Sequence, residues 1–485
     1  MTRRQHAVRR AREAWVALDR YRFVSLSVGI VVCGLLLCAP CVGDDLTVVD
    51  QSGDSDMFEF DGVWRSRGYG WVVVVKRKKV QLYHVAGDTC IRDKGQELFS
   101  FDDFTPGVVS GTNRRVIRTR VDDSDYLHTF ERVAALPQAC VDPAKSDVIS
   151  VFNAVVDYFD AHYPFFDQRH IDWPTVVAQH RARISETMSD KKLFDVIKSL
   201  LTRTGDGHVS IEGRVNGRKK SFEVPDIVVR DRAGGGNWGP SLFGVPLSLG
   251  WSDPERWRHG VGARLSQDGL RYRAGGKISY GLLERDVGYL VIKSMEGMKR
   301  RNVEKIMRDV VDVFANARSV VVDVSVNEGG DDSVSRQIAG YFASQRTLGY
   351  FKFAGDDRQA KPQALYIEPE KTRLSSDVPV FVITSQETYS AAEVFVLSMR
   401  ALPNVTHVGE STAGILSDTL WKPLPNGWII SLSNEVYLDR EMRSFEAVGI
   451  SPMISFDVRT QGKISSGDVA SARSLIQSLH ARASR

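Results

Sequence analysis

The sequence predicts an α/β protein with a smaller β-rich module ahead of its main domain. Between Val287 and Leu402, β-branched runs alternate with amphipathic stretches, the pattern of strands joined by helices. Residues 55–140 instead contain short β-branched and aromatic runs separated by turn residues. The length of 485 residues suits two or three domains.

Residues 1–43 are predicted to be a signal peptide or a membrane anchor. Residues 1–22 hold seven arginines and two acidic residues, and an almost wholly apolar run, 23–42, follows. A basic segment before such a run is typical of export, and both cleavage near Cys41 or Gly43 and an uncleaved anchor stay open. The protein is therefore expected in the periplasm or outside the cell.

The charge argues against a nucleic-acid partner, and the cysteines agree with export. Because the first 22 residues account for the whole net charge of +4, no basic surface remains to indicate a nucleic-acid partner. Only Cys90 and Cys140 lie outside the apolar run. In an oxidising compartment such a pair suggests one disulfide, with two separately buried thiols as the alternative.

A small β-rich domain is predicted over residues 50–142. Its clearest element is a hairpin, in which the runs 70–75 and 80–85 flank the basic turn Lys76-Arg77-Lys78-Lys79. Exposed charges at such a turn also discourage pairing with another sheet.

A helical subdomain is predicted next, over residues 146–210. Apolar residues recur at helical spacing from Val148 to Phe159, with Ser146 as a candidate N-cap, and recur again over 190–202. Residues 211–276 are rich in Gly, Arg and Trp and are predicted to form an insert of loops and strands.

The α/β core is predicted over residues 277–482. The expected strands are 288–292, 319–324 and 378–384, and the expected helices are 303–314, 335–342, 390–402 and 469–479.

Ser390 stands in the segment ETYSAAE (387–393), after a buried strand and at the start of a helix. This position would expose its hydroxyl at the carboxyl end of the strand, where backbone N–H groups face any oxyanion. The alternative is an ordinary capping box, because Ser390 and Glu393 have the spacing of that motif.

Two further segments could complete a site. Asn327-Glu328-Gly329-Gly330 follows another buried strand, and its glycines would let N–H groups approach a carbonyl closely, unless they only make a tight turn. His208 lies among small residues in GDGHVS (205–210), and histidine is the side chain best suited to accept a serine proton. A structural role is its alternative.

The segments GDGHVSI, VVVDVSVNEGG, TYSAAE, VGESTAG and FEAVGISP occur in an order that resembles the tail-specific (C-terminal processing) and tricorn-core serine peptidases. HYPFFDQRHIDW (162–173) resembles their helical region, and the similarity covers about residues 146–460. The resemblance implies a crotonase-like core, a spiral of ββα units. It also implies a protein or peptide substrate and no cofactor.

The resemblance assigns roles to individual residues. Ser390 corresponds to the nucleophile, and the N–H of Ala391, with that of Gly330 or Gly329, corresponds to the oxyanion hole. The tail-specific branch uses a lysine base in a Gly-Lys-Gly turn, but here this position is Ile415.

The tricorn-like branch uses a histidine oriented by a glutamate, which correspond to His208 and Glu446. Pairing with an ionised Glu446 would raise the pKa of His208. Glu410 and Asp206 are secondary candidates for the site.

Other motifs are absent. No PDZ-like pattern occurs between residues 210 and 288, so recognition of free carboxyl termini is not implied. No zincin motif or Cys/His cluster predicts a metal site, and nothing indicates an oligomeric state.

Two other functions stay open. One is a non-catalytic ligand-binding protein on the same fold, and the other is a crotonase-like acyl-CoA enzyme. Export separates the chain from acyl-CoA, and the joint presence of Ser390, His208 and Glu446 favours peptide hydrolysis.

Overall fold

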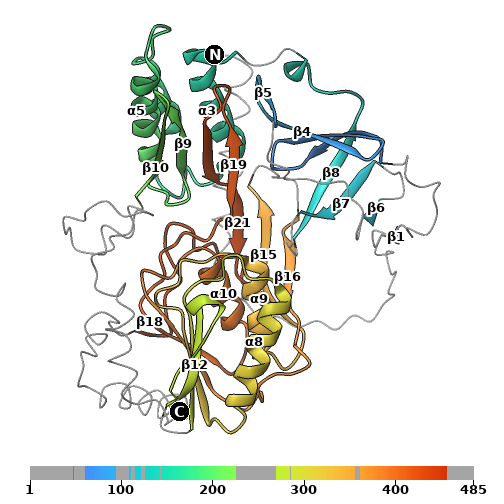
Figure 1. The fold of residues 1–485 in the computed structure, drawn as a ribbon, viewed down its shortest axis with the longest axis vertical. Helices are drawn as coiled ribbons and strands as arrows, with labels where there is room; N and C mark the ends of the chain where they lie inside the picture. Colours follow the sequence, from blue (N-terminus) through green and yellow to red (C-terminus); the bar gives the residue numbers. More distant parts are fainter. Residues whose placement is uncertain are drawn as a thin grey trace, which may run out of the picture. The chain divides into compact units, whose positions relative to one another are not determined.

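The structure is a computed structural model (Figure 1). It describes residues 47–48, 60–93, 109–110, 115–121, 126–141, 145–225, 269–283, 286–355 and 361–455. The predicted export segment, 1–43, and the predicted C-terminal helix, 469–479, lie outside these residues.

The N-terminal module is an antiparallel sheet in the order β1-β6-β7-β8-β2-β3-β4-β5. Its strands are β1 (Thr47–Val48), β2 (Gly62–Ser66), β3 (Trp71–Lys76), β4 (Lys79–Ala86), β5 (Thr89–Arg92), β6 (Val109–Ser110), β7 (Val116–Arg120) and β8 (Leu127–Val133). The predicted hairpin is β3–β4, and its two-residue turn places Arg77 and Lys78 at positive φ, as a type I′ turn requires.

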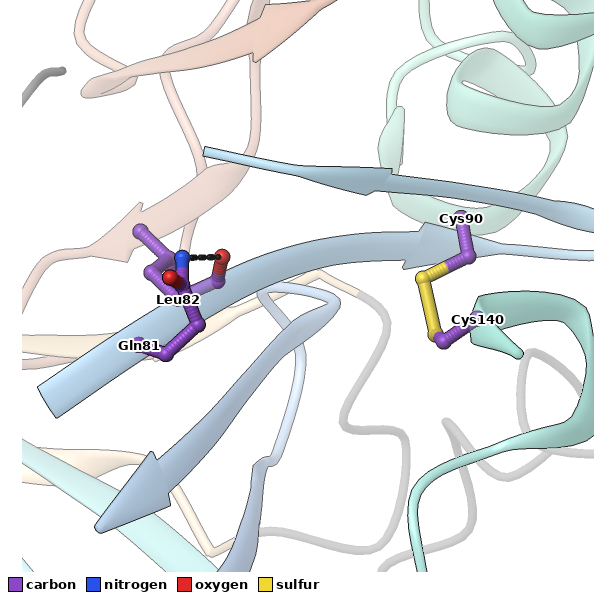
Figure 2. The surroundings of a disulfide bond; sticks show 4 residues. All are labelled: Gln81, Leu82, Cys90 and Cys140. Atoms are coloured by element: carbon purple, nitrogen blue, oxygen red, sulfur yellow. Dashed lines mark hydrogen bonds between the residues drawn. A yellow bond between two sulfur atoms is a disulfide. The ribbon is translucent and has the colours of Figure 1, made fainter. Parts of the chain in front are cut away.

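A disulfide joins Cys90 to Cys140, in agreement with the prediction (Figure 2). Cys90 lies on β5, and Cys140 ends the short 3₁₀ helix η2 (Gln138–Cys140) that follows β8. The disulfide therefore joins β5, the strand at one edge of the sheet, to the segment that follows β8.

The helical region contains α3 (Val148–His162), α4 (Trp173–Arg181), α5 (Asp190–Leu201) and the 3₁₀ helix η3 (Thr202–Thr204). Asp147, rather than the expected Ser146, caps α3, because its carboxylate accepts a hydrogen bond from the N–H of Ser150. Every helix in the described part of the chain is too short or too polar to cross a membrane.

A second sheet has the order β10-β9-β20-β19, with β9 (Ser210–Val215), β10 (Arg218–Glu223), β19 (Thr419–Pro423) and β20 (Ile429–Ser433). The sheet requires glycine at Gly213 on β9, because a Cβ there would lie 2.1 Å from Cδ1 of Trp428. The strand β9, which begins just after His208, thus pairs with β20, a strand more than two hundred residues further along the chain.

The core sheet has the order β11-β12-β13-β14-β17-β18-β22 and is parallel from β13 onward. Its strands are β11 (Arg271–Arg273), β12 (Ile278–Leu283), β13 (Val287–Ile292), β14 (Ser319–Asp323), β17 (Val380–Thr384), β18 (Val405–Gly409) and β22 (Ile454–Ser455), with the 3₁₀ helix η4 (Ala274–Gly276) after β11. The connecting helices are α8 (Arg300–Val313), α9 (Asp332–Gly340) and α10 (Ala391–Arg400) (Figure 1). These elements confirm the predicted α/β class.

A third, small sheet has the order β16-β15-β21. Its strands are β15 (Thr347–Ala354), β16 (Gln363–Ile367) and β21 (Glu435–Leu438). The antiparallel pairing of β15 with β21 brings Lys352 and Glu435 close together.

Two large hydrophobic clusters hold these elements. One joins the N-terminal sheet to α3, α4, α5, β9 and β20, and the other surrounds the core sheet and α8 to α10. Burial of such apolar surface is the main stabilising contribution to folding. The domain boundaries given above stay predictions.

Candidate active site

Ser390 directly precedes α10 and has an unusual backbone conformation. Its φ of 57° and ψ of −132° lie outside the regions that residues with a Cβ adopt readily. Its hydroxyl makes no capping hydrogen bond to the first turn of α10. The local motif is therefore not a capping box, and strain of this kind persists only where surrounding contacts hold it.

Glu393 also lacks the capping-box role. Its carboxyl accepts hydrogen bonds from the hydroxyl of Thr412 and from the N–H groups of Gly414 (2.8 Å) and Ile415 (2.7 Å). Burial raises the pKa of Glu393 to about 8. Glu393 therefore fixes the loop 412–415 instead of the start of its own helix.

The same loop and the turn after β14 hold the serine in place. The N–H of Ser390 donates to the carbonyl of Ile415 (2.9 Å), and the N–H of Tyr389 donates to that of Asn327 (3.1 Å). The hydroxyl of Thr388 donates to the carbonyl of Val324 (2.7 Å). Contacts on both sides thus maintain the strained geometry.

The glycine turn predicted from the sequence packs directly on this serine. A Cβ added to Gly329, whose φ is +94°, would lie 2.7 Å from the Cβ of Ser390 and 2.9 Å from the nitrogen of Ala391. The N–H of Gly329 already donates to Oδ1 of Asn327 (2.8 Å). Within the described residues, the N–H groups of Gly330 and Ala391 donate to no other group. Of the two glycines, Gly330 is therefore the one with a free donor.

His208 lies between η3 and β9. Its own N–H donates to Oδ1 of Asp206 (3.0 Å), and its carbonyl accepts from the hydroxyl of Ser431 (2.7 Å). Its ring Nδ1 is buried and has no hydrogen-bond partner among the described residues. A buried polar atom without a hydrogen-bond partner is uncommon in folded proteins.

The pKa of His208 differs from our expectation. Burial lowers it, and the nearby carboxylates of Asp206 and Asp418 only partly oppose this effect. Glu446, which we expected to raise the pKa, is not among the groups that act on His208. The imidazole is therefore favoured in its neutral form.

Glu446 is held by Arg169 and by backbone. One carboxylate oxygen accepts from Nη2 of Arg169 (2.8 Å), and the other accepts from the N–H groups of Leu416 (2.8 Å) and Ser417 (3.0 Å). Arg169 also donates to the carbonyl of Gly205 (2.7 Å). Arg169 thus connects Glu446 with the turn that carries His208.

Asp206 belongs to the same buried group. It accepts from the hydroxyl of Tyr163 (2.8 Å), and the guanidinium of Arg169 lies 3.6 Å away. Sequence reasoning did not single out Arg169, although it lies in the segment HYPFFDQRHIDW. Its position in that segment, which resembles the helical region of the tail-specific and tricorn-core peptidases, was the available signal.

The predicted residues thus form two groups that meet at the segment 414–417. Ser390 contacts Ile415 in this segment, and Glu446 contacts Leu416 and Ser417. Across the described residues, no hydrogen bond joins His208 to Ser390 or to Glu446.

Glu410, the other secondary candidate, lies at the carboxyl ends of two core strands. Glu410 directly follows β18, and its backbone N–H donates to the carbonyl of Thr384 (3.0 Å), the last residue of the neighbouring strand β17. No group of three or more His, Cys, Asp or Glu side chains could hold a metal ion in the part that the structure describes.

Three solved structures are similar to this chain. A candidate peptidase from Parabacteroides merdae is 24% identical, with 68% of this chain and 97% of that one covered and a TM-score of 0.53, which shows a shared fold. A lipoprotein from Streptococcus agalactiae is 17% identical, with 69% and 97% covered and a TM-score of 0.42. The photosystem II D1 C-terminal processing protease is 12% identical, with 67% and 98% covered and a TM-score of 0.42.

The family model described as peptidase family S41 matches residues 286–456, a range that includes the glycine turn, Ser390 and Glu446. These residues therefore form a peptidase family S41 domain, and the chain is a serine peptidase.

Proposed function

We propose that this protein is an exported serine endopeptidase with Ser390 as its nucleophile. The observation that carries the proposal is the conformation of Ser390, which is strained, uncapped and packed against Gly329 at the start of α10. Nucleophiles are commonly presented on such turns, where the hydroxyl is exposed and backbone donors surround it.

The N–H groups of Gly330 and Ala391 form the proposed oxyanion hole. Both donors are free within the described residues, and Ala391 also begins α10, whose positive helix end favours a developing negative charge. The N–H of Gly329 has a different task, because it holds the side chain of Asn327. Gly329 contributes by allowing the close approach to Ser390.

His208 is the proposed general base. In the first step it accepts the proton of Ser390 as Oγ bonds to the scissile carbonyl carbon, and the carbonyl oxygen gains the negative charge. Collapse of this intermediate breaks the C–N bond, and the departing amine takes the proton from His208. Water then attacks the acyl-enzyme while His208 accepts a proton from it. The bond between Oγ of Ser390 and the acyl carbon breaks, Oγ regains the proton from His208, and the acyl group leaves as a carboxylic acid.

Two observations support His208 in this role. Its buried Nδ1 has no partner in the described residues, and Ile415 occupies the position where a lysine base would stand. In the part of the chain that the structure describes, His208 makes no hydrogen bond to Ser390. The proposed reaction therefore requires the imidazole to approach the serine when substrate binds.

Glu446 is proposed to orient this region through Arg169. Glu446 accepts a hydrogen bond from Arg169, and Arg169 in turn contacts Gly205 and Asp206. These two residues adjoin His208. We therefore treat Glu446 and Arg169 as positioning residues and Asp206 as the carboxylate nearest to the base. Glu410 has no catalytic step in this scheme.

Export and the finer architecture are part of the proposal. The basic and apolar residues at 1–42, together with the Cys90–Cys140 disulfide, support a location in the periplasm or outside the cell. The succession of β12, β13 and α8 is one ββα unit and supports a crotonase-like core built from such units.

The test compares Ser390→Ala with Ser411→Ala, a control at a second serine that follows a neighbouring strand. Ser390→Ala should lower kcat on a casein or peptide substrate by several orders of magnitude while the protein stays folded. Ser411→Ala should retain normal activity. Normal proteolysis by purified Ser390→Ala would exclude Ser390 as the nucleophile, whereas a folded wild-type protein that cleaves no substrate would favour the ligand-binding alternative.

A further inference from the structure

A cavity of about 310 Å³ is lined in part by one residue of the proposed oxyanion hole. Gly330 forms part of its wall, and so do Trp71 and His128 of the N-terminal sheet. Lys352 of β15 and Asn434, just before β21, line its other side. A substrate carbonyl bound to the N–H of Gly330 would therefore lie next to this cavity.

Asn434 is the strongest indication that the cavity takes a ligand. The residue is only 1% exposed, yet neither Oδ1 nor Nδ2 has a hydrogen-bond partner among the described residues. Its backbone is fixed, since its carbonyl accepts from the N–H of Gly355 (2.7 Å). A buried amide without partners is costly, and a ligand with polar groups would supply them.

Lys352 is already paired. Its ammonium lies 2.6 Å from Glu435 and 3.2 Å from Asp332. Although burial favours the neutral amine, these carboxylates raise the pKa of Lys352 well above its usual value. Lys352, the only lysine among the described residues that line the cavity, is therefore charged, and its charge is matched within the protein.

Negative charge remains after this pairing. Asp331 and Asp418 also line the cavity, and Asp418 lies 3.7 Å from Lys352 with 60% of its side chain exposed. Among the described residues, the wall thus holds four carboxyl groups against one lysine, and His128 stays neutral because burial lowers its pKa to about 3. A cation would be attracted to this surface.

Aromatic residues provide the complementary surface. Trp71 and Trp421 both line the cavity, and Trp421 is 44% exposed although tryptophan is usually buried. Indole rings bind alkyl chains by apolar contact and bind ammonium or guanidinium groups through the face of the ring. Acidic groups together with such rings fit a long cationic side chain.

We propose that this cavity binds the side chain of a lysine or arginine beside the scissile bond of a peptide substrate. The proposal rests on the proposed function, because Gly330 would serve both the oxyanion hole and the cavity. Asp418 and the remaining carboxylates would neutralise the cation, the tryptophans would contact its alkyl chain, and Oδ1 of Asn434 would accept a hydrogen bond from its N–H groups.

The test uses internally quenched alanine-rich peptides that differ at one residue, which is arginine, leucine or glutamate. The wild-type protein should cleave beside arginine with a kcat/KM about tenfold or more above that for leucine. Asp418→Asn should lower this arginine-to-leucine ratio about tenfold, since it removes one attracting charge. The ratio cancels any effect of Asp418 on His208, because both peptides use the same base. Asp377→Asn, at an exposed aspartate outside the cavity wall, is the matched control and should leave the ratio unchanged.

A binding measurement separates this proposal from the peptidase proposal. Ser390→Ala should bind the arginine peptide more tightly than the leucine and glutamate peptides in titration calorimetry, and this result supports the cavity even if wild type cleaves none of them. Equal binding of the three peptides, a preference for glutamate, or an unchanged cleavage ratio in Asp418→Asn would overturn the cavity proposal, and proteolysis itself could persist.

Discussion

Arg169 donates a 2.8 Å hydrogen bond to Glu446, and both side chains are at least 95% buried. The same guanidinium donates to the carbonyl of Gly205 and lies 3.6 Å from Asp206. One buried cation therefore balances two buried carboxylates from distant parts of the chain. Without it, these carboxylates would repel each other beside His208.

The first prediction concerns this arginine. Arg169→Met should lower the free energy of unfolding by about 3–5 kcal/mol, because it leaves two buried carboxylates without their cation. Arg183→Met, at an exposed arginine whose bond to Ser199 is long (3.3 Å), should change it little. Urea unfolding of both variants measures the difference. Equal stability of the two variants would contradict the role given to Arg169.

The second prediction concerns the pH profile. If His208 is the base, kcat/KM should fall as pH decreases and His208 becomes protonated. Because burial lowers its pKa, the midpoint should lie below the 6.5 of an ordinary histidine. A midpoint above 6.5 would instead indicate that His208 pairs with an ionised carboxylate such as Glu446 in the free enzyme.

The matching variants are His208→Asn and His170→Asn. His170 is exposed and has a φ of 55°, a conformation that asparagine tolerates. Only His208→Asn should lose most of kcat. If His208→Asn keeps near-normal rates, another residue is the base.

The third prediction tests the glycine turn. Gly329→Ala should lower kcat at least about a hundredfold, since its Cβ would displace Ser390 and the donor Ala391. Gly427→Ala is the matched control, because Gly427 has a similar φ of +83° but no atom within 4 Å of a new Cβ. Both variants acquire backbone strain, so only the clash at the site distinguishes them. Similar activity of the two variants would argue against the proposed arrangement.

The fourth prediction concerns Cys90 and Cys140, which are separated by 50 positions. Replacing both with serine should cost about 2–5 kcal/mol of stability, because the bond closes a long loop in the unfolded chain. Thermal unfolding measures this cost. Peptide mapping under non-reducing conditions should find the two cysteines joined in protein from its native compartment, and two free thiols there would refute the pairing.

The sequence predicted the elements whose signal is local. The strand β14, Ser319–Asp323, corresponds to the predicted strand 319–324. The buried face of α8 corresponds to the predicted helical spacing of Val303, Ile306 and Val310. The hairpin β3–β4 was equally clear, because its two runs and turn are contiguous.

Features that depend on contacts between distant segments could not be predicted from local sequence patterns. The segment ETYSAAE suits a capping box, but the Ser390 hydroxyl makes no capping bond and Glu393 contacts Gly414 and Ile415 instead. In the same way, the pairing of β9 with β20 and the bond from Arg169 to Glu446 join segments more than two hundred residues apart. No local pattern records such a contact.

The central claim is that Ser390 is the nucleophile, and covalent labelling tests it most directly. The full-length protein would be treated with a fluorophosphonate probe, digested and mapped by mass spectrometry, with Ser390→Ala as the control. We expect a single labelled peptide carrying the adduct on Ser390, and no label in the variant. An adduct on another serine, or equal labelling of Ser390→Ala, would contradict it.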